Sequence, residues 1–384
     1  MIYLDHNATS PMRPEAAEAC RHVLDGIHGN PSSVHGPGRS ARAVLDSVRR
    51  EIAGYVGLHD SQVIFTSGGT ESNATALNGI LSRYDSGTLL VSQIEHPSVL
   101  EMAHLHSKQG VVVETIPVDG SGVIQPEKVE EMLQQANAPR AVSVMHANNE
   151  TGVLQPIAAI TGVCRKMGVP LHVDAVQSLG KLDPERERDA FAADLVSISA
   201  HKIGGPKGVG ALLVDKALSL EPLIAGGGQE RNRRSGTENL IGVAGFGAAL
   251  RQSAVTGDQE RLQMQNQRDW LQSELESALP DLLVFGSDVE RLPNTLALAL
   301  PGILGETLVM RMDLEGFAVG SGSACSSGKQ KGSHVLQAMG VAAEISSGLL
   351  RISVGWNTTR QEVEQFRDRF IRIVTEIRAM SPIF

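Results

Sequence analysis

The stretch Ser197-Ile-Ser-Ala-His-Lys-Ile-Gly-Gly-Pro-Lys-Gly208 joins an apolar run to a glycine-rich turn. The run over 193–198 predicts a short buried strand, and the polar trio Ser199, His201 and Lys202 follows it directly. Lys202 is therefore expected at the mouth of a strand. Desolvation there lowers the pKa of a lysine amine, which can then attack a carbonyl carbon and form a Schiff base. The simpler alternative is a surface lysine in a flexible loop.

Strand-like and helical patterns alternate on both sides of this stretch. After a short strand at 2–5, a helix at 14–28, a loop at 29–36 and an amphipathic helix at 40–56, the expected strands are 63–66, 88–92, 111–116, 141–145, 171–173, 194–199 and 209–214. The helices expected between them are 70–81, 98–106, 126–136 and 157–167. This alternation predicts an α/β fold with a largely parallel sheet covered on both faces, which binds ligands beyond the carboxyl ends of its strands.

The remainder predicts a smaller α+β lobe. A long helical region covers 237–278, and its polar middle at 257–261 suggests a kink between two helices. Strands at 282–285 and 295–300, a helix at 305–313 and a last helix at 360–380 complete the chain. We expect a large domain over 15–250 and a small domain formed by 1–14 with 251–384.

Composition narrows the class of protein. The 384 residues carry a net charge of −9 and only 3% aromatic residues, which argues against nucleic-acid binding. No apolar run of about 18 residues predicts a membrane span, and no signal peptide is visible. The cysteines, Cys20, Cys164 and Cys325, are too few for a disulfide framework and indicate a reducing compartment, the cytoplasm by default. Neither histidine nor cysteine spacing predicts a metal site.

Two motifs at strand ends suggest anion binding and proton transfer. Gly69 and Thr70 begin a helix after a strand, where free amides and a hydroxyl can bind an anion. Taken alone, this motif favours a capped helix without a ligand. His96, after the strand at 88–92, could stack on a flat cofactor and move a proton, or be a structural histidine.

Two further strand ends carry polar groups. Asn149 could donate a hydrogen bond to a cofactor or substrate, or simply form a turn. Asp174 closes a buried strand and needs a cationic partner, such as a protonated pyridine nitrogen. A helix N-cap is the competing interpretation of Asp174.

The later motifs are loops and one strand. The Gly- and Arg-rich loop ending near Thr237 suggests a phosphate or subunit contact, or only a solvated loop. Cys325 lies among small residues with lysines downstream, which favours a reactive thiolate over an incidental exposed thiol. Arg351 within a short strand could bind a substrate carboxylate.

Together these motifs resemble those of the cysteine desulfurases, pyridoxal-phosphate enzymes of the class V aminotransferase group with the fold-type I architecture. HGNPSSVHGPGRSAR, FTSGGTESN, EHPSV, NNETG, VDAVQS, SAHKIGGPKG, GGGQE, RSGTEN and GSACSSG occur in the family's order along almost the whole chain. The resemblance implies a mainly parallel seven-stranded sheet in the large domain and the cysteine loop in the small one.

The resemblance also implies roles for individual residues. Lys202 would bind the cofactor, Asp174 its pyridine nitrogen, and His96 would stack on the ring and shuttle protons. Asn149 and Gln177 would contact the ring oxygen and the substrate region. The phosphate would be held by Gly69, Thr70, Ser199 and His201, with Thr237 from the partner subunit of a homodimer. Asn30 and Arg351 would bind the substrate carboxylate.

The implied reaction converts L-cysteine to L-alanine, with Cys325 as sulfur acceptor and carrier. An iron–sulfur scaffold or another sulfur-acceptor protein would be the partner, and Cys325 could briefly contact a nascent cluster. The chain ends at Ser381-Pro-Ile-Phe384, whereas scaffold-dedicated members carry a longer tail. This favours a nitrogenase-type or general sulfur donor. The Cys325 loop resembles the longer version, which disfavours a need for a separate activator.

Two other functions stay open at this stage. A selenocysteine lyase or small-amino-acid aminotransferase could use the same scaffold without needing Cys325. A non-enzymatic sulfur-relay platform would need neither Lys202, Asp174 nor His96.

Overall fold

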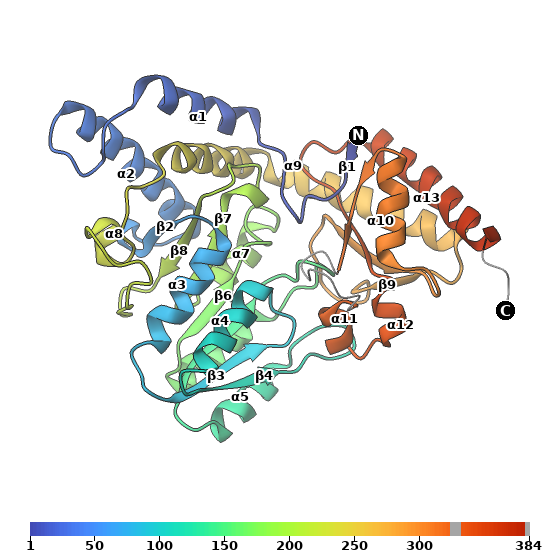
Figure 1. The fold of residues 1–384 in the computed structure, drawn as a ribbon, viewed down its shortest axis with the longest axis horizontal. Coiled ribbons are helices and arrows are strands. Elements are labelled where there is room, and N and C mark those ends of the chain that lie inside the picture. The colour runs from blue at the N-terminus through green and yellow to red at the C-terminus, as the bar shows by residue number, and fades with distance from the viewer. Residues whose placement is uncertain (323–331, 381–384) are drawn as a thin grey trace.

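The larger lobe is built on one sheet, shown by a computed structural model that describes residues 1–322 and 332–380 (Figure 1). The strand order is β2-β8-β7-β6-β5-β3-β4. The strands are β2 (Val63–Thr66), β3 (Gly87–Ser92), β4 (Val111–Ile116), β5 (Pro139–Met145), β6 (Leu171–Asp174), β7 (Leu195–Ser199) and β8 (Gly210–Val214). Pairs from β4 to β7 are parallel, and β8 runs antiparallel to both neighbours. The predicted seven-stranded, mainly parallel sheet is confirmed.

Helices cover this sheet and complete the lobe. They are α1 (Pro14–Gly26), α2 (Gly36–Val56), α3 (Gly69–Leu81), α4 (Pro97–Ser107), α5 (Pro126–Gln135), α6 (Ile157–Met167), α7 (Pro184–Phe191) and the short α8 (Gln229–Asn232). The sequence missed α7 and α8. It also began α2 four residues late, because Gly36-Pro37-Gly38 looks like a loop. Proline is tolerated in a first helical turn, and His35 Nδ1 caps this turn by accepting from Gly38 N at 3.2 Å.

The parallel arrangement brings several loops to one edge of the sheet. Strands β3, β5, β6 and β7 are adjacent and parallel, so their carboxyl ends lie side by side. The strand β2, antiparallel to β8, also ends at this edge. The chain leaves β3 for β4 on one side and returns to β5 on the other, so the strand order reverses at β3. A crevice forms at such a reversal, and ligands bind there in open α/β sheets.

One long helix, α9 (Leu240–Ala278), runs from the larger lobe into the smaller one (Figure 1). The kink expected at 257–261 is not observed. The polar residues there make ion pairs instead of breaking the helix: the Glu260 carboxylate accepts from Arg13 Nη2 at 2.6 Å. Buried residues in its first half join the core of the larger lobe, whereas Met264, Leu271 and Leu275 join that of the smaller lobe.

Among the described residues, none of the helices combines the length and the apolar character that a membrane span needs.

The smaller lobe combines the N-terminal strand with the last third of the chain. Its antiparallel sheet has the order β12-β13-β10-β9, and β1 pairs in parallel with β11. Its elements are β1 (Ile2–Tyr3), β9 (Leu283–Phe285), β10 (Thr295–Ala299), α10 (Gly305–Leu314), β11 (Phe317–Ala318), β12 (Gly320–Ser321), α11 (His334–Ala338), α12 (Ala343–Ser346), β13 (Leu350–Ser353) and α13 (Arg360–Met380). Leu4 packs in the same core as Phe366 and Phe370. These contacts support our proposed division into 15–250 and 1–14 with 251–384.

A buried ion pair anchors the glycine-rich loop after β8 to the sheet. The Glu230 carboxylate accepts from both terminal nitrogens of Arg49 at 2.7 Å and from Phe65 N at 2.9 Å. The exposed fractions of the two side chains are 5% for Arg49 and 1% for Glu230. Arg49 also donates to Val63 O at 2.6 Å. The pair therefore ties α2, β2 and α8 together at one edge of the sheet.

Replacing Glu230 by alanine should lower the free energy of unfolding by about 3–5 kcal/mol, because the buried Arg49 guanidinium would lose its counter-charge. Glu290→Ala is the matched control, since Glu290 pairs with Arg186 and is 66% exposed. That change should cost less than about 1 kcal/mol. Urea-induced unfolding measures both, and equal losses would contradict the assigned role of the buried pair.

Candidate active site

A pocket of about 260 Å³ lies at the carboxyl edge of the large sheet. Its lining includes most residues that the sequence predicted for a cofactor site, namely Gly69, Thr70, His96, Asn149, Asp174, Gln177, His201 and Lys202. The loops after β2, β3, β5, β6 and β7 each contribute. The topology thus brings together residues that are more than 130 positions apart in the chain.

Asp174 ends β6 and is 6% exposed. Its Oδ2 accepts from Asn73 Nδ2 at 2.7 Å and its Oδ1 from Val176 N at 2.9 Å. The second bond closes a local turn, and no helix begins here, so the N-cap interpretation is wrong. Within the described residues no cationic side chain lies within ion-pair distance of Asp174. A carboxylate held by amide donors alone suits a cationic ligand nitrogen.

His96 is fixed at the start of α4. Its Nδ1 accepts from Ser98 N at 3.1 Å, so the proton of the neutral ring lies on Nε2. Ser98 Oγ in turn accepts from Asn73 Nδ2 at 2.9 Å, which links His96 to the amide that holds Asp174. Burial lowers the pKa of His96, and nearby Lys202 and His334 lower it further. The Asp174 carboxylate opposes part of this shift. The ring therefore stays unprotonated to a lower pH than a free histidine does.

The start of α3 forms an anion-binding wall. Gly68 has φ 151°, and the first-turn amides that follow it carry the positive end of the helix dipole. A Cβ on Gly69 would lie 2.7 Å from Val176 Cγ2, so a larger residue would fill this space. Opposite, Ser199 Oγ is buried without a hydrogen-bond partner among the described residues. Burial, followed by the charge of Lys202, lowers the pKa of His201 to about 4.

Lys202 ends the short 3₁₀ turn, Ala200–Lys202, that follows β7. Its Nζ donates to Asn7 O at 2.5 Å and to Ala8 O at 2.9 Å. Gly204, with φ 83°, continues the turn in a conformation that favours glycine. The N-terminal segment therefore holds the amine at the pocket, where it can reach a bound carbonyl compound.

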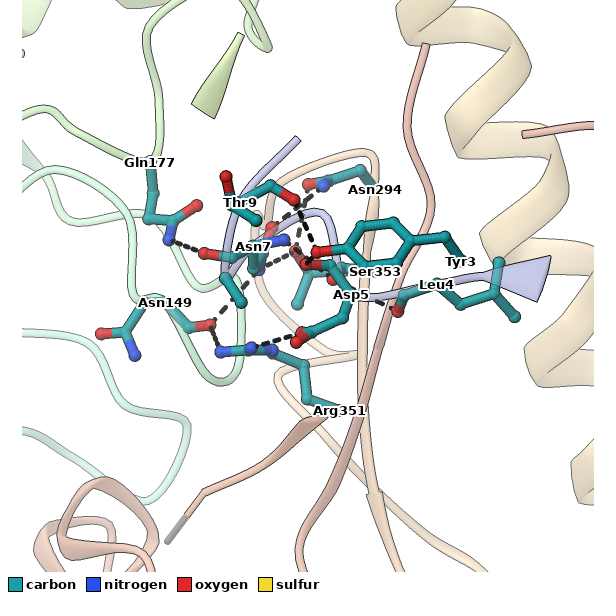
Figure 2. A network of polar contacts seen from close by, with 12 residues as sticks. Tyr3, Leu4, Asp5, Asn7, Thr9, Asn149, Gln177, Asn294, Arg351 and Ser353 are labelled. Carbon is teal, nitrogen blue, oxygen red and sulfur yellow. Dashed lines mark hydrogen bonds and ion pairs between the residues drawn. The ribbon is translucent and has the colours of Figure 1, made fainter. Parts of the chain in front are cut away.

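The lining lacks four of the predicted residues that the structure describes, namely Asn30, Ser199, Thr237 and Arg351. Asn30 and Thr237 are exposed in loops, and Cys325 lies outside the described residues. Arg351 lies in β13 at the junction of the lobes, where its Nη2 donates to Asp5 Oδ1 at 2.7 Å and its Nη1 to Asn149 O at 2.8 Å (Figure 2). Its Nε is buried without a partner among the described residues. The two terminal nitrogens thus already have acceptors within the chain.

The sequence missed three polar residues around the pocket. Asn73 lies one turn after Thr70 on the same face of α3, a spacing that could have identified it. Asn7 and Lys181 carried no such signal, because their partners come from distant segments. Asn7 contacts Asn149, Gln177 and Lys202, and Lys181 contacts Gln177 and Asn7. These contacts form the network drawn in part in Figure 2.

Comparison with known proteins gives consistent matches over nearly the whole chain. Residues 2–366 match the family described as Aminotransferase class-V. The cysteine desulfurase IscS of Dictyoglomus turgidum is 38% identical over 383 residues, which cover 99% of this chain and 96% of that protein. A solved NifS-like protein has a TM-score of 0.90 and 33% identity, covering 97% of this chain and 99% of its own. The structure described as SspA in complex with cysteine has a TM-score of 0.79 and 30% identity, covering 94% and 100% of the two chains.

The lowered pKa of His96 predicts a specific pH dependence of stability. Below about pH 6.5 the unfolded chain binds a proton at His96 that the folded chain does not, so the free energy of unfolding falls as the pH falls. The slope per proton is about 1.4 kcal/mol per pH unit. His96→Asn keeps an oxygen acceptor for the cap but removes the titration. Urea unfolding from pH 8 to 5 should show a steeper decline for the native protein, and parallel curves would contradict this assignment.

Proposed function

Because the chain belongs to the class-V aminotransferase family and is a pyridoxal-phosphate-dependent enzyme, we propose that it is a cysteine desulfurase. It converts L-cysteine to L-alanine and transfers the sulfur to its own Cys325. The single observation that carries this proposal is the convergence of Lys202, Asp174 and His96 on one pocket, in a chain whose relatives include cysteine desulfurases.

The residues present fit the cofactor. Ser199 Oγ lacks a partner among the described residues, and Gly69 leaves space that a Cβ would fill, as a phosphate site at the start of α3 requires. Asp174 would supply the carboxylate for the pyridine nitrogen, and no side chain of residues 1–322 or 332–380 forms an ion pair with it. His201, Asn149 and Gln177 line the same pocket. His201 would complete the phosphate ligands, and Asn149 and Gln177 would contact the ring oxygen.

Pyridoxal phosphate, when bound, draws electrons from the substrate carbon atoms next to its nitrogen. The protein's own groups do the rest. Lys202 binds the cofactor, then takes the proton from the substrate Cα and can return a proton to the product. Asp174 keeps the ring nitrogen protonated. His96, with a proton on Nε2 and a lowered pKa, would exchange protons with the substrate.

The sulfur transfer needs one nucleophile. The Cys325 thiolate attacks the substrate sulfur, so an S–S bond forms while the Cβ–S bond breaks. The electron pair of that bond stays with Cβ, which takes up a proton and becomes the methyl group of alanine. Cys325 keeps the sulfur as a persulfide, and no external oxidant is consumed.

Three parts of the proposal concern partners and location. Thr237 is exposed and lies outside its own pocket, which supports a homodimer in which it completes the phosphate site of the partner subunit. Asn30 and Arg351 would bind the substrate carboxylate, with Arg351 exchanging a contact with Asp5 or Asn149 for the substrate. The persulfide would serve iron–sulfur cluster assembly or other thio-cofactors through an acceptor protein, in the cytoplasm.

The visible spectrum and products with L-cysteine test this function. The native protein should show a cofactor band, and it should form alanine and, with a reductant, sulfide. Cys325→Ala should still change its spectrum on binding L-cysteine but release sulfur at least about a hundredfold more slowly, because the nucleophile is gone. Cys20→Ala is the control and should keep its activity, since Cys20 lies in α1 away from the pocket.

Other outcomes identify the alternatives. Undiminished sulfur release by Cys325→Ala would overturn the desulfurase mechanism and point to a lyase. Amino-group transfer to a keto acid without any sulfur release would indicate an aminotransferase. A protein without a cofactor band would contradict the assignment of the pocket.

A further inference from the structure

Lys181 is a buried lysine near the pocket. It lies just after the VDAVQS motif, and the proposed mechanism assigns it no role. Its exposed fraction is 5%, although lysines are rarely buried unless they are paired with a carboxylate. Its Nζ donates instead to two amide oxygens, Gln177 Oε1 at 2.9 Å and Asn7 Oδ1 at 3.3 Å. Burial, with the charges of Lys202 and Arg351 nearby, lowers the pKa of Lys181 well below its usual range.

The contact with Lys181 determines the orientation of the Gln177 amide. Because Lys181 Nζ donates to the carboxamide oxygen of Gln177, the Gln177 nitrogen lies on the other side. There Nε2 donates to Asn7 O at 2.9 Å, and the same oxygen accepts from Lys202 Nζ at 2.5 Å. Gln177 and Lys202 thus donate to the same acceptor at the edge of the pocket.

Lys181 itself does not line the cofactor pocket. It lines a separate cavity of about 20 Å³ on the other side of Lys202, together with His6, Arg13 and Glu260. Any effect of Lys181 on a bound cofactor that depends on contact must therefore pass through a neighbour. Gln177 is the neighbour with the shorter bond to Lys181, and it lies in the wall of the cofactor pocket.

We propose that Lys181 is a positioning residue, which acts through Gln177 by holding its amide in the orientation that meets the cofactor. The inference rests on the proposed function, because that function assigns Gln177 to the cofactor. Loss of Lys181 would leave Gln177 Oε1 buried without this donor, and an unsatisfied buried acceptor costs about 1–3 kcal/mol. The amide would then leave its place in the wall to find another donor.

A purely structural role would give a different result. Lys181 also contacts Asn7, so it could only tie the N-terminal segment to the larger lobe. In that case its removal would weaken cofactor binding whether or not Gln177 is present. A double-mutant cycle separates the two roles, because only action through Gln177 makes the effects non-additive.

The experiment measures the dissociation constant of pyridoxal phosphate by titrating cofactor-free native protein, Lys181→Met, Gln177→Ala and the double variant. Lys181→Met should raise this constant about tenfold in the native background, in line with one unsatisfied buried acceptor. In the Gln177→Ala background the same change should raise it less than about twofold. Lys216→Met, an exposed lysine, is the matched control and should have no effect.

Melting temperatures of the cofactor-free proteins establish that each variant is folded. If Lys181→Met does not fold, the cycle is run with Lys181→Leu, which also lacks a donor, and the same pattern is expected. An equal loss of affinity in both backgrounds, or no loss in either, would overturn the inference. Failure of the native protein to bind pyridoxal phosphate would instead refute the proposed function on which the inference rests.

Discussion

The pocket depends most on the hydrogen bonds that the backbone oxygen of Asn7 accepts. This oxygen accepts from Lys202 Nζ and from Gln177 Nε2, so the N-terminal segment holds two groups of the larger lobe in place. The Asn7 side chain reaches the smaller lobe, where its Nδ2 donates to Thr295 Oγ1 at 2.8 Å and its Oδ1 accepts from Asn294 Nδ2 at 3.0 Å (Figure 2). The first seven residues of the chain therefore connect the two lobes at the pocket.

The sheet supplies the other constraint. Parallel strands must all end at the same edge, and the order of strands reverses at β3, so polar loops from distant segments meet there. Asp174 lies at the end of a buried strand, and among the described residues it is held by the amides of Asn73 and Val176. The same few loops thus provide an acidic group, an amine and an anion site within one pocket.

Periodicity and turn residues predicted most of this framework. The strands and helices between 63 and 214 were predicted to within a few residues, apart from α7, whose Pro184-Glu-Arg-Glu-Arg sequence shows little apolar periodicity. Strand ends located His96, Asn149, Asp174 and Lys202. Sequence could not reveal Asn7 or Lys181, because their roles depend on contacts that span some 170 to 290 positions, and it placed a kink in α9 where ion pairs keep the helix continuous.

Two lysines, Lys202 and Lys181, share Asn7 as a partner, and the account assigns the cofactor to only one of them. The most direct test is to treat the protein with pyridoxal phosphate, reduce it with borohydride and map the modified peptides by mass spectrometry. We predict a phosphopyridoxyl group on Lys202 and none on Lys181. Modification of Lys181, or of surface lysines without Lys202, would contradict it.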